Sequence, residues 1–237
     1  MSRPAFWTPL KEADRPALVV MLVTLAAMVA YAYFGTAPAY DRLFGAGPGE
    51  GRDLYRGLYP VGTAFLLLGL LPVVAALLGG ARLETLGLCL GDWRFGLKAL
   101  GVALPLLAPI LYLGTVDRAF QLEYPLAPWA ARSGSHFAAW AGIYLVYYIG
   151  WETGFRGVQQ LWLGRRIGDL QALLVQTATS TLLHLGKPAG ETFAALIAGP
   201  LFGLLALRTG SVVWIILLHW LVGLMNDFFC VLRSTGW

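Results

Sequence analysis

The chain has 237 residues, of which 58% are hydrophobic and only 13% are charged. Soluble domains carry roughly a quarter of charged residues, so this composition excludes an ordinary soluble protein and predicts a membrane protein. The formal net charge of +4 is scattered in ones and twos between apolar runs. This scatter is typical of loop and headgroup charges, and it argues against a nucleic-acid partner.

Long apolar runs predict an all-α, polytopic membrane helical bundle with about seven transmembrane helices, because about 20 apolar residues cross a bilayer. Cys89 and Cys230 lie in apolar surroundings without metal-ligand spacing, so they predict neither a disulfide framework nor a zinc ribbon. The expected spans are 17–34, 59–78 and 97–113 in an N-terminal segment (1–136), and 137–163, 169–185, 190–207 and 212–232 in a core segment (137–232).

The first apolar run precedes Ala37-Pro38-Ala39, which resembles a signal-peptidase site, but the run is long and further spans follow. A retained first helix is therefore expected. Glycine, proline and charge predict an exposed loop over 35–57, a second loop over 117–135 and an interfacial connector over 82–95. The distribution of Lys and Arg favours a cytoplasmic N-terminus. No internal repeat is visible, which disfavours an inverted-repeat transporter.

The fourth predicted span contains a carboxylate and a guanidinium, Glu152 and Arg156, as the only charged residues between 137 and 163. Residues four apart share one face of a helix, so the two side chains can pair there. An ionisable residue at membrane depth costs at least a few kcal/mol and is by default a functional candidate. Glu152 is either a general base or metal ligand supported by Arg156, or half of a structural clamp.

Two histidines lie in later spans. His184 ends a stripe of small hydroxyl residues in the fifth span, where such residues alone would indicate helix packing. His219 lies in the middle of the apolar seventh span and must find a polar partner or a cavity. Asn226 falls on the same helical face as His219.

Lys187 and Glu191 flank the turn that follows His184. Glu191 in the first turn of the sixth helix is stabilised by the helix dipole, which is a sufficient reason for its presence. It is also placed to reach back toward His184 as a hydrogen-bond acceptor.

Glu152, His184 and His219 come from three different predicted helices and together are what a water-activating site needs. The carboxylate would take the proton while the imidazoles orient water or stabilise an oxyanion. Alternatively, all three would ligate a divalent metal such as zinc, with one position left open for water. Their spacing matches no short metal motif, so both alternatives stay open.

From Phe137 to Cys230 the order of these residues resembles the CAAX-protease and bacteriocin-processing (CPBP, or Abi) family of intramembrane endopeptidases. That family carries E-E-x-x-x-R, F-x-x-x-H and H-x-x-x-N, each on its own membrane helix. Phe155-Arg156-Gly157 fixes the alignment. The resemblance implies that Glu152, Arg156, His184 and His219 occupy family site positions.

The chain departs from the family pattern at three positions. Trp151 stands at the first glutamate, to which the family's general-base role is usually given, Ser180 replaces the aromatic of the second motif, and Gly223 replaces the asparagine of the third. A variant branch with W-E-x-x-F-R-G and H-x-G-K-P-x-x-E is similar at Trp151, Glu152, His184, Lys187 and Glu191.

Two functions follow from the resemblance. In the first, the protein hydrolyses a peptide bond in a membrane-associated peptide or protein, Glu152 activates water, and Asn226 or Glu191 makes good the missing asparagine and glutamate. In the second, the site is inactive and the fold serves as a membrane binding, immunity or scaffold protein. The short Ala- and Gly-rich chain is similar to bacterial members, which implies a multi-pass protein of the bacterial cytoplasmic membrane.

Overall fold

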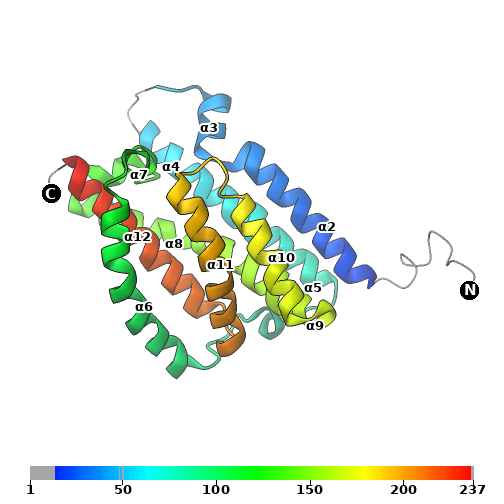
Figure 1. Ribbon diagram of the computed structural model, residues 1–237. Coiled ribbons are helices and arrows are strands. Elements are labelled where there is room, and N and C mark those ends of the chain that lie inside the picture. Colours follow the sequence, from blue (N-terminus) through cyan, green and yellow to red (C-terminus); the bar gives the residue numbers. More distant parts are fainter. Residues whose placement is uncertain (1–13, 48, 50, 236–237) are drawn as a thin grey trace, which may run out of the picture.

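The computed structural model describes residues 14–47, 49 and 51–235, and over these residues the chain folds into helices without a strand. The all-α fold expected from the sequence is confirmed (Figure 1). The first thirteen residues of the predicted N-terminal segment, together with Pro48 and Glu50 of its loop, lie outside the described residues.

Three of the long helices are each built from consecutive segments that join without a break. A first helix comprises α2 (Arg15–Ala30) and the π-helical η1 (Tyr31–Gly35), and a second comprises α4 (Arg52–Thr63), η2 (Ala64–Leu70) and α5 (Leu71–Leu78). The central helix comprises α8 (Gly134–Glu152), the π-helical η5 (Thr153–Trp162) and α9 (Leu163–Ile167). The remaining α-helices are α3 (Ala37–Phe44), α6 (Trp93–Gly114), α7 (Arg118–Glu123), α10 (Asp169–Leu182), α11 (Ala189–Thr209) and α12 (Val213–Thr235).

Within the described residues, five helices are long and apolar enough to cross a membrane, namely 15–35, 52–78, 93–114, 189–209 and 213–234. The fourth and fifth predicted spans fall outside this set. Tyrosines, glutamines and two charges lower the hydropathy of the central helix, and α10 has only 14 residues. Because the central helix packs against η2, α4, α10 and α12, its polar side chains are covered by apolar neighbours.

The two predicted loops contain helices. Thr36 caps α3, because its hydroxyl oxygen accepts a hydrogen bond from the Ala39 N–H at 3.4 Å. Helix α4 begins at Arg52, seven residues before Tyr59, where the second span was predicted to start. Asp117 caps α7 by accepting the Ala119 N–H at 2.9 Å. Local caps of this kind fold short polar segments that lack the apolar periodicity on which a sequence prediction depends.

Glycines let the second helix and the central helix approach until their backbones touch. A Cβ on Gly150 would lie 2.5 Å from Phe65 Cα, and a Cβ on Gly154 would lie 1.9 Å from the Leu68 carbonyl oxygen. Small residues at such crossings are the usual means by which membrane helices pack closely. The crossing fixes the part of the central helix that carries Glu152.

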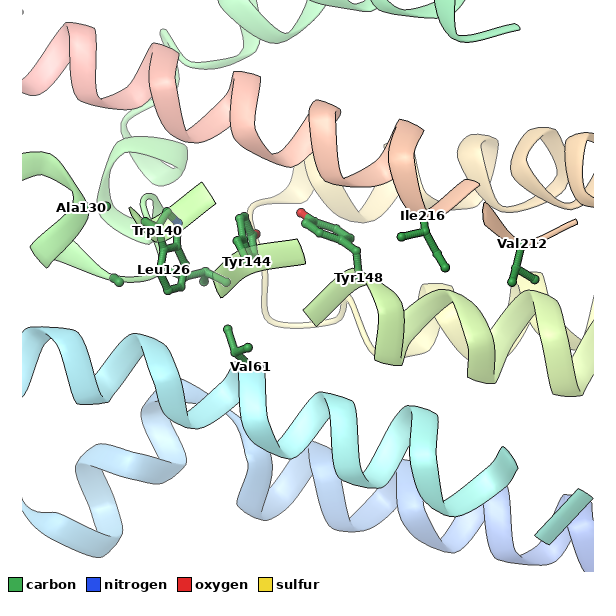
Figure 2. Close-up of a cluster of buried hydrophobic side chains, with 9 residues drawn as sticks. Val61, Leu126, Ala130, Trp140, Tyr144, Tyr148, Val212 and Ile216 are labelled. Carbon is green, nitrogen blue, oxygen red and sulfur yellow. The ribbon is translucent and has the colours of Figure 1, made fainter. Parts of the chain in front are cut away.

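A buried aromatic ladder lies between α4 and α12. Trp140, Tyr144 and Tyr148 follow one another along α8, facing Val61 on one side and Ile216 on the other (Figure 2). Trp140 stacks on Tyr144 with ring centroids 5.0 Å apart, and its Nε1 donates to Asp227 of α12 at 2.9 Å. The ladder therefore sets the position of α12 relative to α8.

The connector predicted over 82–95 docks on the turn between α11 and α12. The Val212 N–H donates to the Gly87 carbonyl and the Asp92 N–H to the Thr209 carbonyl, both at 2.9 Å. The indole of Trp214 donates to the Leu90 carbonyl at 2.8 Å. These bonds hold the start of α12, the helix that carries His219.

The close crossing at Gly150 and Gly154, called the glycine crossing below, predicts that replacing a glycine by alanine destabilises the protein at the crossing but not elsewhere in the same helix. Gly154→Ala should destabilise the protein by roughly 1–3 kcal/mol, because the new methyl group meets a backbone carbonyl that cannot move aside. Thermal or denaturant unfolding in detergent micelles would measure the change.

Gly142→Ala is the matched control, since Gly142 lies in the same helix with open space around its Cβ position. There the substitution should leave stability unchanged or raise it by about 0.5–1 kcal/mol through helix propensity. Equal stabilities of the two variants would contradict the proposed close crossing.

Candidate active site

Glu152 and Arg156 form an ion pair at the centre of the bundle. Arg156 Nη1 lies 3.1 Å from Glu152 Oε2 and donates to Oε1 at 3.2 Å. The Arg156 side chain is 3% exposed and the Glu152 side chain is 0% exposed. A charge removed so completely from solvent must be paired, and the partner four residues away supplies this locally.

His219 of α12 completes the cluster. Its Nδ1 lies 2.5 Å from Glu152 Oε1 across 67 residues of sequence. A carboxylate held by an arginine can only accept, so Nδ1 carries the proton and donates it. This leaves the Nε2 lone pair of His219 free to accept a proton.

The segment after Glu152 is π-helical, and nine of its ten residues are buried. It presents its polar side chains to three different neighbours. Arg156 turns to Glu152, Gln160 donates to the Gly203 carbonyl of α11 at 2.7 Å, and Gln159 accepts from Thr179 of α10 at 2.7 Å. π-helical turns are frequent at functional sites, where they re-aim side chains.

His184 lies in the turn after α10 with its ring oriented by its own helix. Its Nδ1 donates to the Ser180 carbonyl at 2.7 Å, because a carbonyl can only accept. Its Nε2 lies 4.0 Å from Glu191 Oε1, a gap that one water can bridge. The expected contact with Glu191 is thus a near approach rather than a direct hydrogen bond.

A cavity of about 320 Å³ opens on the two histidines. His184, His219, Trp151 and Tyr148 line it, and much of the remaining wall is aromatic or charged, comprising Tyr31, Tyr124, Tyr144, Tyr147, Arg42, Glu123, Lys187 and Glu191. Its volume is at the lower end of the range for ligand-binding pockets. Glu152 does not line it, so the carboxylate reaches the cavity through His219.

A second hollow of about 30 Å³ lies against α11. Trp151, His184 and His219 line this hollow as well as the large cavity, and Arg156 and Ser180 contribute to it. Its size suits about one water molecule. The two imidazoles and the indole therefore form a wall shared by both spaces.

Lys187 and Glu191 belong to a charged group that lines the large cavity. Lys187 donates to Glu123, and Tyr124 donates to Glu191 Oε1 at 2.7 Å. Burial lowers the pKa of Lys187, but the carboxylates of Glu191 and Glu123 outweigh burial and raise it. Burial and the Glu191 carboxylate raise the pKa of Tyr124 well above its usual value, so the phenol stays a donor.

The three departures from the family motifs have distinct surroundings. Trp151 is 3% exposed and packs edge-on to His184 with ring centroids 5.3 Å apart. Among the described residues no acceptor bonds to Trp151 Nε1. Ser180 supplies the carbonyl that orients His184.

Gly223 makes room for a tyrosine. A Cβ at this position would lie 1.9 Å from the hydroxyl oxygen of Tyr148. Asn226, expected to replace the missing asparagine, is 7% exposed and lines neither the large cavity nor the small hollow.

The side chains do not fit a metal centre. Over the described residues, no group of three or more His, Cys, Asp and Glu has metal-binding geometry. His219 Nδ1 and Glu152 are committed to each other, and Arg156 places a positive charge beside them. We therefore derive no catalytic step through zinc or another cation at Glu152, His184 and His219.

Sequence reasoning missed Tyr31, Glu123 and Tyr124 among the aromatic and charged residues that line the large cavity. Tyr31 comes from η1, Glu123 from α7 and Tyr124 from the residue after it, so the lining is assembled from segments far apart in the chain. Glu123 lay in a predicted loop, and its pairing with Lys187 crosses 64 residues. Periodicity within one segment carries no signal of such contacts.

The comparisons with known proteins agree with the resemblance found from the motifs. Residues 133–225 match a family model described as "Type II CAAX prenyl endopeptidase Rce1-like". This range includes Glu152, Arg156, His184 and His219. A search of curated proteins and a search of solved structures each found no match.

Breaking the buried ion pair should destabilise the fold. Arg156→Ala leaves Glu152 without its local counter-ion in an apolar interior, and truncation of one partner of such a pair typically costs roughly 3–5 kcal/mol. Unfolding of the detergent-solubilised variant would measure the loss.

Arg208→Ala serves as the control, because Arg208 pairs with Asp92 at 2.9 Å while its side chain remains 56% exposed. An exposed pair contributes about 0–1 kcal/mol. Similar losses in both variants would contradict a special role for the buried pair.

Proposed function

We propose, from the match of residues 133–225 to the Rce1-like family model of type II CAAX prenyl endopeptidases, that this protein is an intramembrane endopeptidase that hydrolyses a peptide bond in a membrane-associated peptide or protein. The observation that carries the proposal is the hydrogen bond between His219 Nδ1 and Glu152 Oε1 at 2.5 Å, which leaves an imidazole Nε2 lone pair at a cavity.

His219 is the general base, and Glu152 acts through it. A buried carboxylate hydrogen-bonded to Nδ1 fixes the tautomer and stabilises the imidazolium that forms when Nε2 takes a proton. Arg156 keeps Glu152 ionised. The motif order suggested that Glu152 itself activates water. We instead assign this role to His219, because Glu152 is fully buried and lines neither the large cavity nor the second hollow.

The reaction needs only water and the peptide. The water oxygen forms a bond to the scissile carbonyl carbon, one water proton passes to His219 Nε2, and the carbonyl π electrons move onto oxygen. The tetrahedral intermediate then collapses as the C–N bond breaks, and the imidazolium returns its proton to the leaving amine. His184, with Nδ1 tied to Ser180, assists by orienting water at the shared wall.

The large cavity is the substrate site. Its aromatic lining suits apolar side chains, and the Lys187, Glu123 and Glu191 group in its wall offers partners for peptide polar groups. Membrane peptides, anchors and C-terminal membrane tails are the expected substrates. We place the protein in a bacterial cytoplasmic membrane, where such substrates are at bilayer depth.

Removal of the base should abolish cleavage. His219→Ala in detergent should lower the turnover of internally quenched peptides with apolar C-terminal tails by at least about 10²-fold, the usual contribution of a general base. Fluorescence release over time gives the rates.

His136→Ala provides the histidine control, since His136 bonds to Ser133 at the start of α8 and lines neither cavity. It should cleave like wild type. Equal cleavage by wild type and His219→Ala would refute the assignment. A folded wild type without any cleavage would instead favour the binding, immunity or scaffold function.

A further inference from the structure

The site has a hydroxyl-bearing side chain that the hydrolytic scheme above does not use. Tyr148 lies one helical turn before Glu152 on α8, and its ring centroid is 4.5 Å from that of His219. Both side chains line the large cavity. A polar group of Tyr148 is thus placed beside the proposed base and on the substrate side of it.

The position of the Tyr148 hydroxyl is set by a glycine of the opposite helix. Gly223 lies four residues after His219, so the two share one face of α12. Any side chain at 223 would start 1.9 Å from the Tyr148 hydroxyl oxygen and 2.7 Å from its Cζ. The hydroxyl therefore occupies the space that a side chain one turn beyond His219 would fill.

The tyrosine ring is held rigidly. Tyr148 is 4% exposed and belongs to the buried ladder with Tyr144, whose ring centroid lies 4.8 Å away (Figure 2). A donor fixed by packing needs no reorganisation when charge develops near it, which is the property that makes an oxyanion donor effective. A phenol O–H is also neutral, so its presence adds no charge to the buried cluster.

We infer that the Tyr148 hydroxyl, seated over Gly223, donates a hydrogen bond to the carbonyl oxygen of the scissile peptide bond and stabilises the oxyanion formed when water attacks. The inference rests on the proposed peptidase function. Water activated at His219 Nε2 must attack a carbonyl in the large cavity beside His219, and the Tyr148 hydroxyl is a donor that α8 places there, with its ring against the imidazole.

The test removes the hydroxyl alone. Tyr148→Phe should lower kcat by about 10²-fold, the loss expected for one oxyanion donor, while KM and the unfolding temperature stay near wild type. The assay uses the wild-type chain and its variants with the same quenched peptides in detergent. A packing role would instead change stability or KM and leave kcat intact.

A second variant reaches the hydroxyl from the other helix. Gly223→Ala keeps Tyr148 but places a methyl group where its oxygen lies, so the hydroxyl must move and kcat should fall to a similar degree. Tyr59→Phe is the control, because it also loses a hydroxyl, one that donates to the Phe34 carbonyl at 2.7 Å outside both cavities. Its kcat should equal that of wild type.

The outcomes separate this inference from the function on which it rests. If His219→Ala is inactive while Tyr148→Phe retains the wild-type kcat, the peptidase function stands and the role of Tyr148 is overturned. If the wild type cleaves no peptide, the function and the inference fall together. Loss of kcat in both Tyr148→Phe and Gly223→Ala, with Tyr59→Phe unaffected, supports the assignment.

Discussion

The structure depends on the satisfaction of one buried negative charge. Glu152 is fully enclosed, and an unpaired carboxylate in such surroundings would cost several kcal/mol or more. Arg156 on the same helix and His219 on α12 both contact the Glu152 carboxylate. The charge therefore joins two helices that lie far apart in the sequence. The glycine crossing with η2, the aromatic ladder and the docked connector all fix the helices that bring these groups together.

The sequence predicted the elements that follow from composition and periodicity. The all-α membrane fold is confirmed, and the resemblance read from the motifs agrees with the family model that matches residues 133–225, because apolar length and motif order are properties of the chain itself. Helices α3 and α7, within the predicted loops, could not be predicted, since they depend on caps at Thr36 and Asp117 rather than on an apolar stripe. Among the site residues, Glu152–Arg156 pairing was predictable from spacing. The contact of Glu152 with His219 and the enclosure of the carboxylate were not, because they depend on how α8 and α12 cross.

Two of the three departures from the family motifs, at Trp151 and Gly223, place an aromatic ring where the family has a polar group, whereas Ser180 is the reverse exchange. Trp151 stacks on Tyr147 with centroids 5.7 Å apart and abuts His184. Gly223 leaves room for Tyr148, and Phe202 of α11 lies edge-on to His219 at 5.3 Å. Both imidazoles are consequently bordered by rings. Rings exclude water and restrict imidazole rotation, so the hydrogen bonds of His184 and His219 act in surroundings of low polarity, where they are electrostatically stronger.

The spacing of the buried cluster along the chain has a consequence for biosynthesis. Glu152 is synthesised 67 residues before His219, so for that interval it must exist without its histidine. Arg156 follows only four residues later and can neutralise it as soon as the helical turn forms. The central helix can thus be delivered to the translocon with no net charge at this position, and α12, arriving afterwards, docks on a carboxylate that already has a counter-ion. Arg156 thus supplies a counter-ion for Glu152 from the adjacent helical turn before the rest of the bundle is made.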